Sequence, residues 1–225
     1  MKIIAVSDLH GNLIKIKDEC DVFVIAGDWS PLQVQSINSL MTNWVTDEFI
    51  PWMMELNAKH VILIPGNHDF ICTTKKFRSD FLYSITKMGL HKKIHYLCNE
   101  SVVIDDKKFY GMPNNESPNG WAFSKTNGQS YDFEADTDIL ITHQPPMIGD
   151  VGFVSKYNKD LGSRELRNKL LDSVVSLNIC GHIHTGSHLE HIIRGKKGNL
   201  ISVFNVSILD EDYDIAYNPT IIEIK

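Results

Sequence analysis

Long apolar runs, clustered cysteines and a surplus of positive charge are all missing from the sequence. No uncharged stretch approaches the roughly 20 residues of a membrane-spanning helix. The N-terminal apolar run stops at Asp8, which is too short for the core of a signal peptide. The four cysteines lie far apart and form no Cys-x-x-Cys pair, a spacing typical of free thiols in a reducing compartment. We therefore expect a cytoplasmic protein with no membrane partner.

The charge balance is acidic, with 22 Lys and Arg against 28 Asp and Glu and a formal net charge of −6. Extended nucleic acid is usually bound by a basic face that replaces counterions, so this balance argues against such a partner. A small phosphate ligand is not excluded, because the local charge at a metal site can oppose the net charge. Hydrophobic residues make up 43% of the chain, which is enough for the core of a single domain spanning 1–225.

Short β-branched apolar runs alternate with amphipathic stretches, which predicts an α/β fold with two sheets packed face to face and helices outside. Strands are expected at 3–6, 22–26, 61–64, 94–97, 102–104, 109–110, 139–142 and 179–180, with closing antiparallel strands at 187–193, 200–206 and 220–224. Helices are expected at 32–56, broken or restarted at Pro51, at 77–88, and after a cap at Ser163. Two long loops, 111–132 and 143–162, are expected to line a substrate pocket.

Polar residues of the metal-ligand type follow five of the expected strands. They are Asp8 and His10, then Asp28, then Asn67, His68 and Asp69, then His143, and finally His182 and His184. Each short motif alone is more often a turn or a surface residue than a ligand. Because ligands of open α/β folds bind beyond the carboxyl ends of strands, five such motifs in succession predict one metal site. The other histidines, at 60, 91, 95, 188 and 191, are expected to be structural or exposed.

Imidazole combined with carboxylate suits Mn, Fe or Zn better than Ca, which prefers oxygen ligands. One carboxylate can bridge two ions about 3.5–4 Å apart. Two divalent ions carry four positive charges, of which Asp8 and Asp28 would cancel two, so the site would attract a phosphate ester. A water molecule shared by the two ions would ionise near neutral pH and attack the ester as a metal-bridged hydroxide.

In this order the motifs resemble the calcineurin-like metallophosphoesterase superfamily. Its pattern is Asp-x-His, Gly-Asp, Gly-Asn-His-Asp/Glu, a later His and Gly-His-x-His, and every part is present between Asp8 and His184. The resemblance implies a four-layer αββα sandwich. It also implies one metal held by Asp8, His10, Asp28 and His184, and a second held by Asp28, Asn67, His143 and His182. His68 would donate a proton to the leaving oxygen and Asp69 would orient it.

The second half of the chain resembles the metallophosphoesterase-domain-containing subgroup more closely. The segments that carry this resemblance are Tyr110-Gly111-x-Pro113, Trp121-Ala122-Phe123, residues 138–146, Asn205-Val206-Ser207 and Asn218-Pro219-Thr220. This resemblance implies hydrolysis of cyclic nucleotides and other phosphodiesters. Some mammalian members have Gly in place of the first His of Gly-His-x-His, whereas this chain keeps His182.

Protein phosphatases of the superfamily place Arg after the Gly-Asp and Gly-Asn-His motifs, where it clamps a monoester. Trp29 and Phe70 stand nearby in this chain, and no Arg does. A bidentate Arg most favours a doubly charged monoester, so its absence favours a diester. The sequence predicts a small-molecule phosphodiesterase; a monoesterase, a nuclease and a non-catalytic scaffold are the alternatives. Candidates for base stacking, weighed against simple packing, are Trp29, Trp121, Phe123 and Phe153, with packing favoured for Trp121 and Phe123.

Overall fold

The computed structural model describes residues 1–125 and 130–224, and most of its strands belong to two mixed sheets. The first sheet has the order β13–β1–β2–β3–β4. Its strands are β1 (Lys2–Val6), β2 (Cys20–Ala26), β3 (Ala58–Ile64), β4 (Ile94–Tyr96) and β13 (Thr220–Glu223). Strands β1 to β4 run parallel, and β13 pairs antiparallel with β1. The parallel strands therefore end at one common edge.

The second sheet has the order β11–β12–β10–β7–β6–β5. Its strands are β5 (Glu100–Ile104), β6 (Lys107–Met112), β7 (Ile139–Thr142), β10 (Leu177–Cys180), β11 (His191–Arg194) and β12 (Leu200–Asn205). The prediction that the last strands are all antiparallel is wrong for β12, which pairs parallel with β10. The reason is that β11 runs antiparallel to β12 and returns the chain, so β12 points the same way as β10.

The helices cover the outer faces of the sheets. They are α1 (Asn38–Trp44), α2 (Ile50–Glu55), α3 (Lys75–Lys87) and α4 (Arg164–Leu171). Helical structure begins at Asn38 rather than at residue 32, because the segment before it is a turn. The regular α-helix is interrupted before Pro51: a π-helix at Val45–Phe49 follows α1, and the α-helix restarts as α2 with Pro51 in its first turn, in line with the expected break or restart. A proline cannot donate an N–H to the preceding turn, and the wider π-helical turn just before Pro51 fits that loss.

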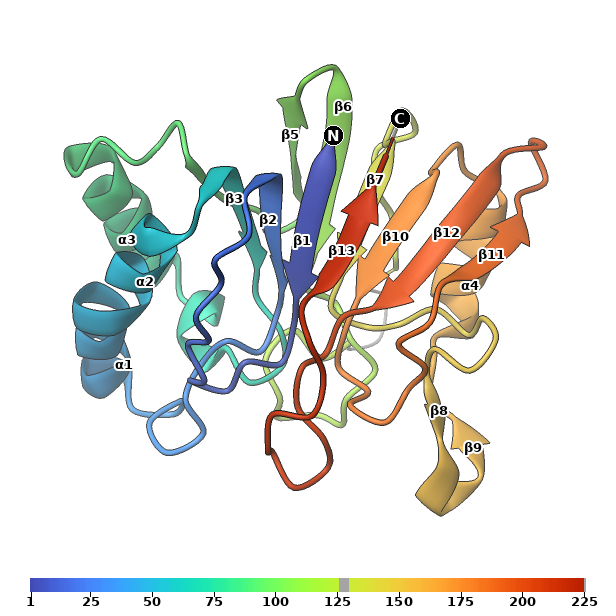
Figure 1. Cartoon of the computed structure of the whole chain (residues 1–225). Helices are drawn as coiled ribbons and strands as arrows, with labels where there is room; N and C mark the ends of the chain where they lie inside the picture. The colour runs from blue at the N-terminus through green and yellow to red at the C-terminus, as the bar shows by residue number, and fades with distance from the viewer. Residues whose placement is uncertain (126–129, 225) are drawn as a thin grey trace.

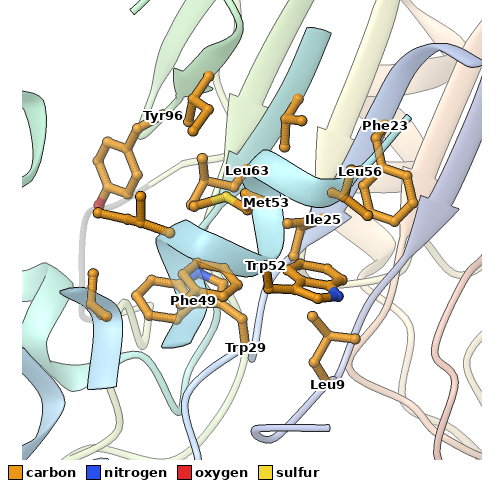
Figure 2. Close-up of a cluster of buried hydrophobic side chains, with 14 of the residues drawn as sticks. Leu9, Phe23, Ile25, Trp29, Phe49, Trp52, Met53, Leu56, Leu63 and Tyr96 are labelled. Carbon is orange, nitrogen blue, oxygen red and sulfur yellow. The ribbon is translucent and has the colours of Figure 1, made fainter. Parts of the chain in front are cut away.

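Three buried clusters separate four layers of structure. The first packs α1 to α3 on one face of the first sheet, the second lies between the sheets, and the third packs α4 on the far face of the second sheet. Successive residues of one strand point to opposite faces of the sheet and therefore enter different clusters, as Ile4 and Ala5 of β1 do. Figure 2 shows part of the first cluster, including Trp29, Phe49 and Trp52. The predicted α/β sandwich of two mixed sheets with flanking helices is confirmed.

The two long loops differ from each other. The predicted loop 111–132 begins inside β6 and continues irregularly, and its residues 126–129 lie outside the described residues. The loop predicted at 143–162 contains a hairpin of β8 (Phe153–Val154) and β9 (Lys159–Asp160), joined by a 3₁₀ turn at Ser155–Tyr157. This hairpin projects at the lower right of Figure 1, on the side where β1, β10 and β12 end. Among the described residues no helix has the length and apolar character of a membrane span.

Candidate metal centre

The ligand-type residues lie together where β1, β2, β3, β7 and β10 end. Three groups of histidine and carboxylate side chains place their ligand atoms within 4.8 Å of one another. The groups are Asp8, His10 and His184; His10, Asp28 and His68; and Asp28, His143 and His182. His10 and Asp28 each belong to two groups, so the three groups form one continuous centre. Five separate strand ends therefore meet at one place, as the spacing of the motifs predicts.

The backbone at this centre is held in unusual conformations. Asp8, His10, Asp28 and His182 have φ values of 57°, 43°, 53° and 70°, in the left-handed region that costs energy for residues other than glycine. Hydrogen bonds fix the strand ends against each other: the Asp8 N–H donates to the Gly27 carbonyl at 3.0 Å, and the His10 N–H donates to the Asp28 carbonyl at 2.9 Å. The surrounding structure thus imposes the direction in which each ligand side chain points.

Asp8 has one satisfied oxygen and one free oxygen. Its Oδ2 accepts from the Ser207 hydroxyl at 2.7 Å and from the His182 N–H at 2.9 Å. Its Oδ1 and the Nδ1 of His10 are buried and have no hydrogen-bond partner in the described part of the chain. Nε2 of His184 lies 3.5 Å from this Oδ1. Buried polar atoms are normally hydrogen-bonded, so an orphaned carboxylate oxygen that faces an imidazole nitrogen fits a bound cation. The donor set of the first predicted site therefore suits a divalent metal.

Asp28 lies between the two predicted metal positions. Its Oδ1 accepts from the His68 N–H at 2.7 Å. Its Oδ2 lies 3.2 Å from Nε2 of His143 and 4.0 Å from Nε2 of His10. Asn67 completes this side, with its Oδ1 2.9 Å from Nε2 of His143. One carboxylate oxygen therefore faces histidines assigned to both sites, which is the placement that a bridging ligand requires.

Outer hydrogen bonds orient two of the histidine ligands. Nδ1 of His143 is 3.0 Å from the Ala26 carbonyl oxygen, and Nδ1 of His184 is 2.8 Å from the Asp210 carbonyl oxygen. A carbonyl oxygen only accepts, so each ring carries its proton on Nδ1 and directs Nε2 into the centre. Metal-binding histidines are commonly oriented in this way.

Opposing effects set the pKa values of the centre. Burial alone would lower the pKa of His143, but the charge of Asp28 raises it to about 9. Burial lowers the pKa of His182 to about 4, and the neighbouring His143 acts in the same direction. Burial would raise the pKa of Asp28, but the nearby histidines, His143 first, hold it well below its usual range. A buried carboxylate that stays ionised suits a site for cations.

His68 and Asp69 are not arranged as the resemblance implies. The carboxylate of Asp69 accepts from the backbone N–H groups of Asp28, Gly66 and Ser30 and from the Ser30 hydroxyl, at 2.6–2.9 Å. The ring of His68 instead pairs with Gln35, its Nδ1 lying 2.7 Å from Oε1. Asp69 thus fixes the loops that carry Asp28 and His68, and the expectation that it orients the His68 ring is corrected. Burial lowers the pKa of His68 despite the opposing charge of Asp28.

Two of the aromatic candidates for base stacking pack in or against the core. Trp29 is only 1% exposed and stacks on Phe49 at 4.7 Å between ring centroids (Figure 2). Phe123 packs against the same cluster. Trp121 is 37% exposed, and its ring lies 4.6 Å from that of His68, so it contacts the candidate acid. Trp29 is therefore ruled out as a stacking residue, because the core already covers its ring.

Several residues of the centre were missed by reasoning from the sequence. Ser207 holds Asp8, Gln35 holds His68, and the ring of Tyr213 packs edge-on against His10 at 5.0 Å and against His184 at 5.3 Å. Ser207 lies 199 residues from its partner and Gln35 lies 33 residues from its own. No local sequence pattern predicts contacts between residues that lie so far apart in the chain. The segment Asn205-Val206-Ser207, part of the subgroup resemblance, was the one available signal.

Two packed mixed sheets, with carboxylates and histidines gathered at their strand ends, define a metal-dependent hydrolase of the α/β class. Residues 1–186 match the model of the calcineurin-like phosphoesterase family. The chain belongs to this family of metal-dependent phosphoester hydrolases, whose members bind divalent metals.

Relatives agree with this membership. Metallophosphoesterase domain-containing protein 1 of Homo sapiens is 28% identical over 207 residues, an alignment that covers 82% of this chain and 61% of the human protein. A UPF0046 protein of Caenorhabditis elegans is 27% identical over 243 residues, covering 100% of this chain and 81% of the nematode protein. The chain thus spans about three fifths of the length of the human relative.

Proposed function

We propose that this protein is a dinuclear-metal phosphodiesterase that acts on small substrates such as cyclic nucleotides. The observation that carries the proposal is the position of Asp28 between two groups of ligands, one with Asp8, His10 and His184 and the other with His143 and His182. Mononuclear sites have no need of a shared carboxylate. Two neighbouring cations, in contrast, form the clamp that phosphoryl transfer uses.

The first ion would be held by Asp8, His10, Asp28 and His184, and the second by Asp28, Asn67, His143 and His182. Mixed oxygen and imidazole donors suit Mn²⁺, with Fe or Zn as alternatives. When bound, such ions polarise phosphoryl oxygens and lower the pKa of coordinated water. The chain itself contributes the fixed ligand directions, the oriented rings of His143 and His184, and a buried setting that strengthens electrostatic attraction to a phosphate.

A cavity of about 360 Å³ opens over the centre. Its lining includes Asp28, Asn67, His68, His182 and His184, and beyond them Val154, Lys156, Tyr157, Ile183, Thr185, Glu211 and Tyr213. Within the described part of the chain no arginine lines this cavity. A monoester dianion would therefore lack a bidentate clamp, whereas a diester, with a single negative charge, has less need of one. This supports a diester as the substrate.

The preference for diesters is testable directly. With Mn²⁺ added, bis(p-nitrophenyl) phosphate is expected to be hydrolysed with a kcat/KM about tenfold or more above that of p-nitrophenyl phosphate, since a missing charge-assisted hydrogen bond costs about 1.5–3 kcal/mol. Initial rates under identical metal conditions give the ratio. A clear preference for the monoester would favour a phosphatase, faster cleavage of oligonucleotides a nuclease, and no turnover of any ester a scaffold.

We further infer that His68 is the general acid and that Gln35 positions its ring. The Oε1 of Gln35 can accept the Nδ1 proton of His68, and this leaves Nε2 free to face the cavity. The ring is also held between Trp121 and His10, at centroid distances of 4.6 Å from each. Among the described residues the Gln35 side chain forms no hydrogen bond with an assigned metal ligand, so it acts through His68.

Gln35→Ala is expected to slow hydrolysis of an alkyl diester by about tenfold, the value of one lost hydrogen bond of roughly 1–1.5 kcal/mol. Hydrolysis of a p-nitrophenyl diester, which needs no proton on its leaving group, should change little. Gln35→Glu keeps an acceptor oxygen and should restore most of the alkyl rate. Gln33→Ala, at an exposed position of the same turn, is the control. Equal losses on both substrates, or a loss in the control, would contradict the positioning role.

A further inference from the structure

The β8–β9 hairpin brings side chains to the cavity that the metal centre does not use. Val154, Lys156 and Tyr157 all line the cavity, and they belong to β8 or to the 3₁₀ turn that follows it. The turn ends at Asn158, whose φ of 45° reverses the chain into β9. Nothing in the catalytic assignments above gives these residues a task.

The hairpin is fixed relative to the metal centre. The Ser187 N–H, three residues after His184, donates to the Asp150 carbonyl at 2.8 Å. The amide of Asn205 donates to the Val151 carbonyl at 3.1 Å and to the Ile183 carbonyl at 2.7 Å, which joins the hairpin base to the segment between His182 and His184. The hairpin therefore presents its turn at a set position beside the centre.

Tyr157 is an aromatic side chain with a free face. It is 64% exposed, and no aromatic ring among residues 1–125 and 130–224 stacks on it. Tyr213, the other tyrosine of the cavity, is instead committed to His10 and His184. An exposed ring on the wall of a phosphate-binding cavity can stack on a planar base, since every nucleobase has a π-face.

Lys156 is a cation that forms no ion pair with any residue that the structure describes. It is exposed and its Nζ lies 5.8 Å from the ring centroid of Tyr157. No other lysine or arginine of the described chain lines the cavity. A free positive charge next to a free aromatic face matches the two parts of a nucleotide, its phosphate and its base.

We propose that Tyr157 and Lys156 form a nucleotide subsite beside the metal centre, in which Tyr157 stacks on the base and Lys156 attracts the phosphate. The substrate class that follows is a phosphodiester with a nucleoside on one side. This inference rests on the proposed function for its substrate class, and it goes further by assigning recognition of the base to the hairpin. It also replaces Trp29, whose ring is buried, as the stacking residue.

Binding of AMP and of ribose 5-phosphate to the Mn²⁺-loaded protein tests the subsite, because the two ligands share the sugar phosphate and differ by the base. Isothermal titration calorimetry should show tighter binding of AMP to the parent. Tyr157→Ala should reduce this advantage by about 5- to 100-fold, the usual effect of losing one stacked base, and leave ribose 5-phosphate unchanged. Lys156→Ala should weaken both ligands alike, by about 2- to 5-fold.

Matched variants separate stacking from general damage. Tyr157→Phe keeps the ring and should bind AMP as the parent does. Tyr83→Ala removes a tyrosine of similar exposure, 68%, on α3, and Lys159→Ala removes a lysine from the same hairpin outside the cavity lining; both should be silent. The subsite is overturned if the parent binds the two ligands equally, if Tyr157→Ala keeps the preference for AMP, or if Tyr83→Ala loses it as well.

The same proteins distinguish failure of the subsite from failure of the proposed function. Turnover of bis(p-nitrophenyl) phosphate by the parent, together with AMP binding that ignores Tyr157, would overturn the subsite and leave the phosphodiesterase standing. AMP binding that depends on Tyr157, without turnover of any diester, would support the subsite and overturn the phosphodiesterase.

Discussion

Asp28→Asn is expected to lower the Mn²⁺ content below two ions per chain and to reduce diester hydrolysis by roughly 10³-fold or more. The estimate follows because metal ions contribute several kcal/mol of transition-state stabilisation, and each 1.36 kcal/mol is a tenfold change in rate. A substitution at Asp28 is the most informative test of the two-metal proposal, because its Oδ2 faces histidines of both proposed sites. An asparagine keeps an oxygen that can accept the His68 N–H, so the local fold should persist.

Elemental analysis of protein loaded with Mn²⁺, combined with initial rates on bis(p-nitrophenyl) phosphate, measures both effects. Asp80→Asn is the matched control, since Asp80 is an exposed carboxylate paired with Lys76 on α3 and far in sequence from the strand ends. Circular dichroism should give the same spectrum for parent, variant and control. A parent with a metal content near zero, or an Asp28→Asn protein as active as the parent, would reject the two-metal proposal.

The sequence predicts much of this centre because the relevant patterns are local. Buried parallel strands are recognisable in the sequence as short β-branched runs, as at Val22 to Ala26. A metal ligand that directly follows such a run lies at the edge of the sheet where the parallel strands end. Parallel pairing then aligns the ends of β1, β2 and β3 in the first sheet and those of β7 and β10 in the second. Family resemblance adds which ligands belong together. Two of the three clusters of ligand atoms fall within that grouping, whereas the third joins His10 and Asp28 to His68, which the resemblance assigns as the proton donor.

Features set by tertiary contacts could not be predicted in this way. Strands of two residues, such as β8 and β9, are too short to show alternation, so the sequence predicts an irregular loop where the hairpin with Lys156 and Tyr157 lies. Leu32 and Val34 continue the helical spacing of α1, yet they lie in a turn that brings Gln35 to His68. Asp69 follows His68 directly, which suggests a pair, but its oxygens accept from backbone donors in the loop after β2, at Asp28 and Ser30, and from Gly66 in its own loop.

Two roles are compatible with the position of His68, metal ligand and proton donor, and a single variant separates them. One group of potential ligand atoms consists of His10, Asp28 and His68, and Nε2 of His68 lies 4.0 Å from Oδ2 of Asp28, so the ring is near enough to serve as a ligand. The other role is that of a proton donor. It is supported by the pairing of Nδ1 with Gln35 and by the exposure of the ring to the cavity. A protonated ring would be favoured by the negative charge of a bound diester, which opposes the effect of burial.

His68→Ala is expected to slow hydrolysis of a nucleotide or alkyl diester by roughly 10²–10⁴-fold, the usual contribution of general acid catalysis. A departing sugar alkoxide needs a proton in the transition state, whereas p-nitrophenolate leaves without one, so the p-nitrophenyl diester should be slowed much less. The Mn²⁺ content should equal that of the parent.

Rates on 2′,3′-cyclic AMP and bis(p-nitrophenyl) phosphate, with elemental analysis of the same samples, supply these values. His95→Ala, which removes a half-buried histidine on β4 whose ring pairs with that of His60, serves as the control. Equal losses on the two substrates, or a missing metal ion, would make His68 a ligand instead of the acid.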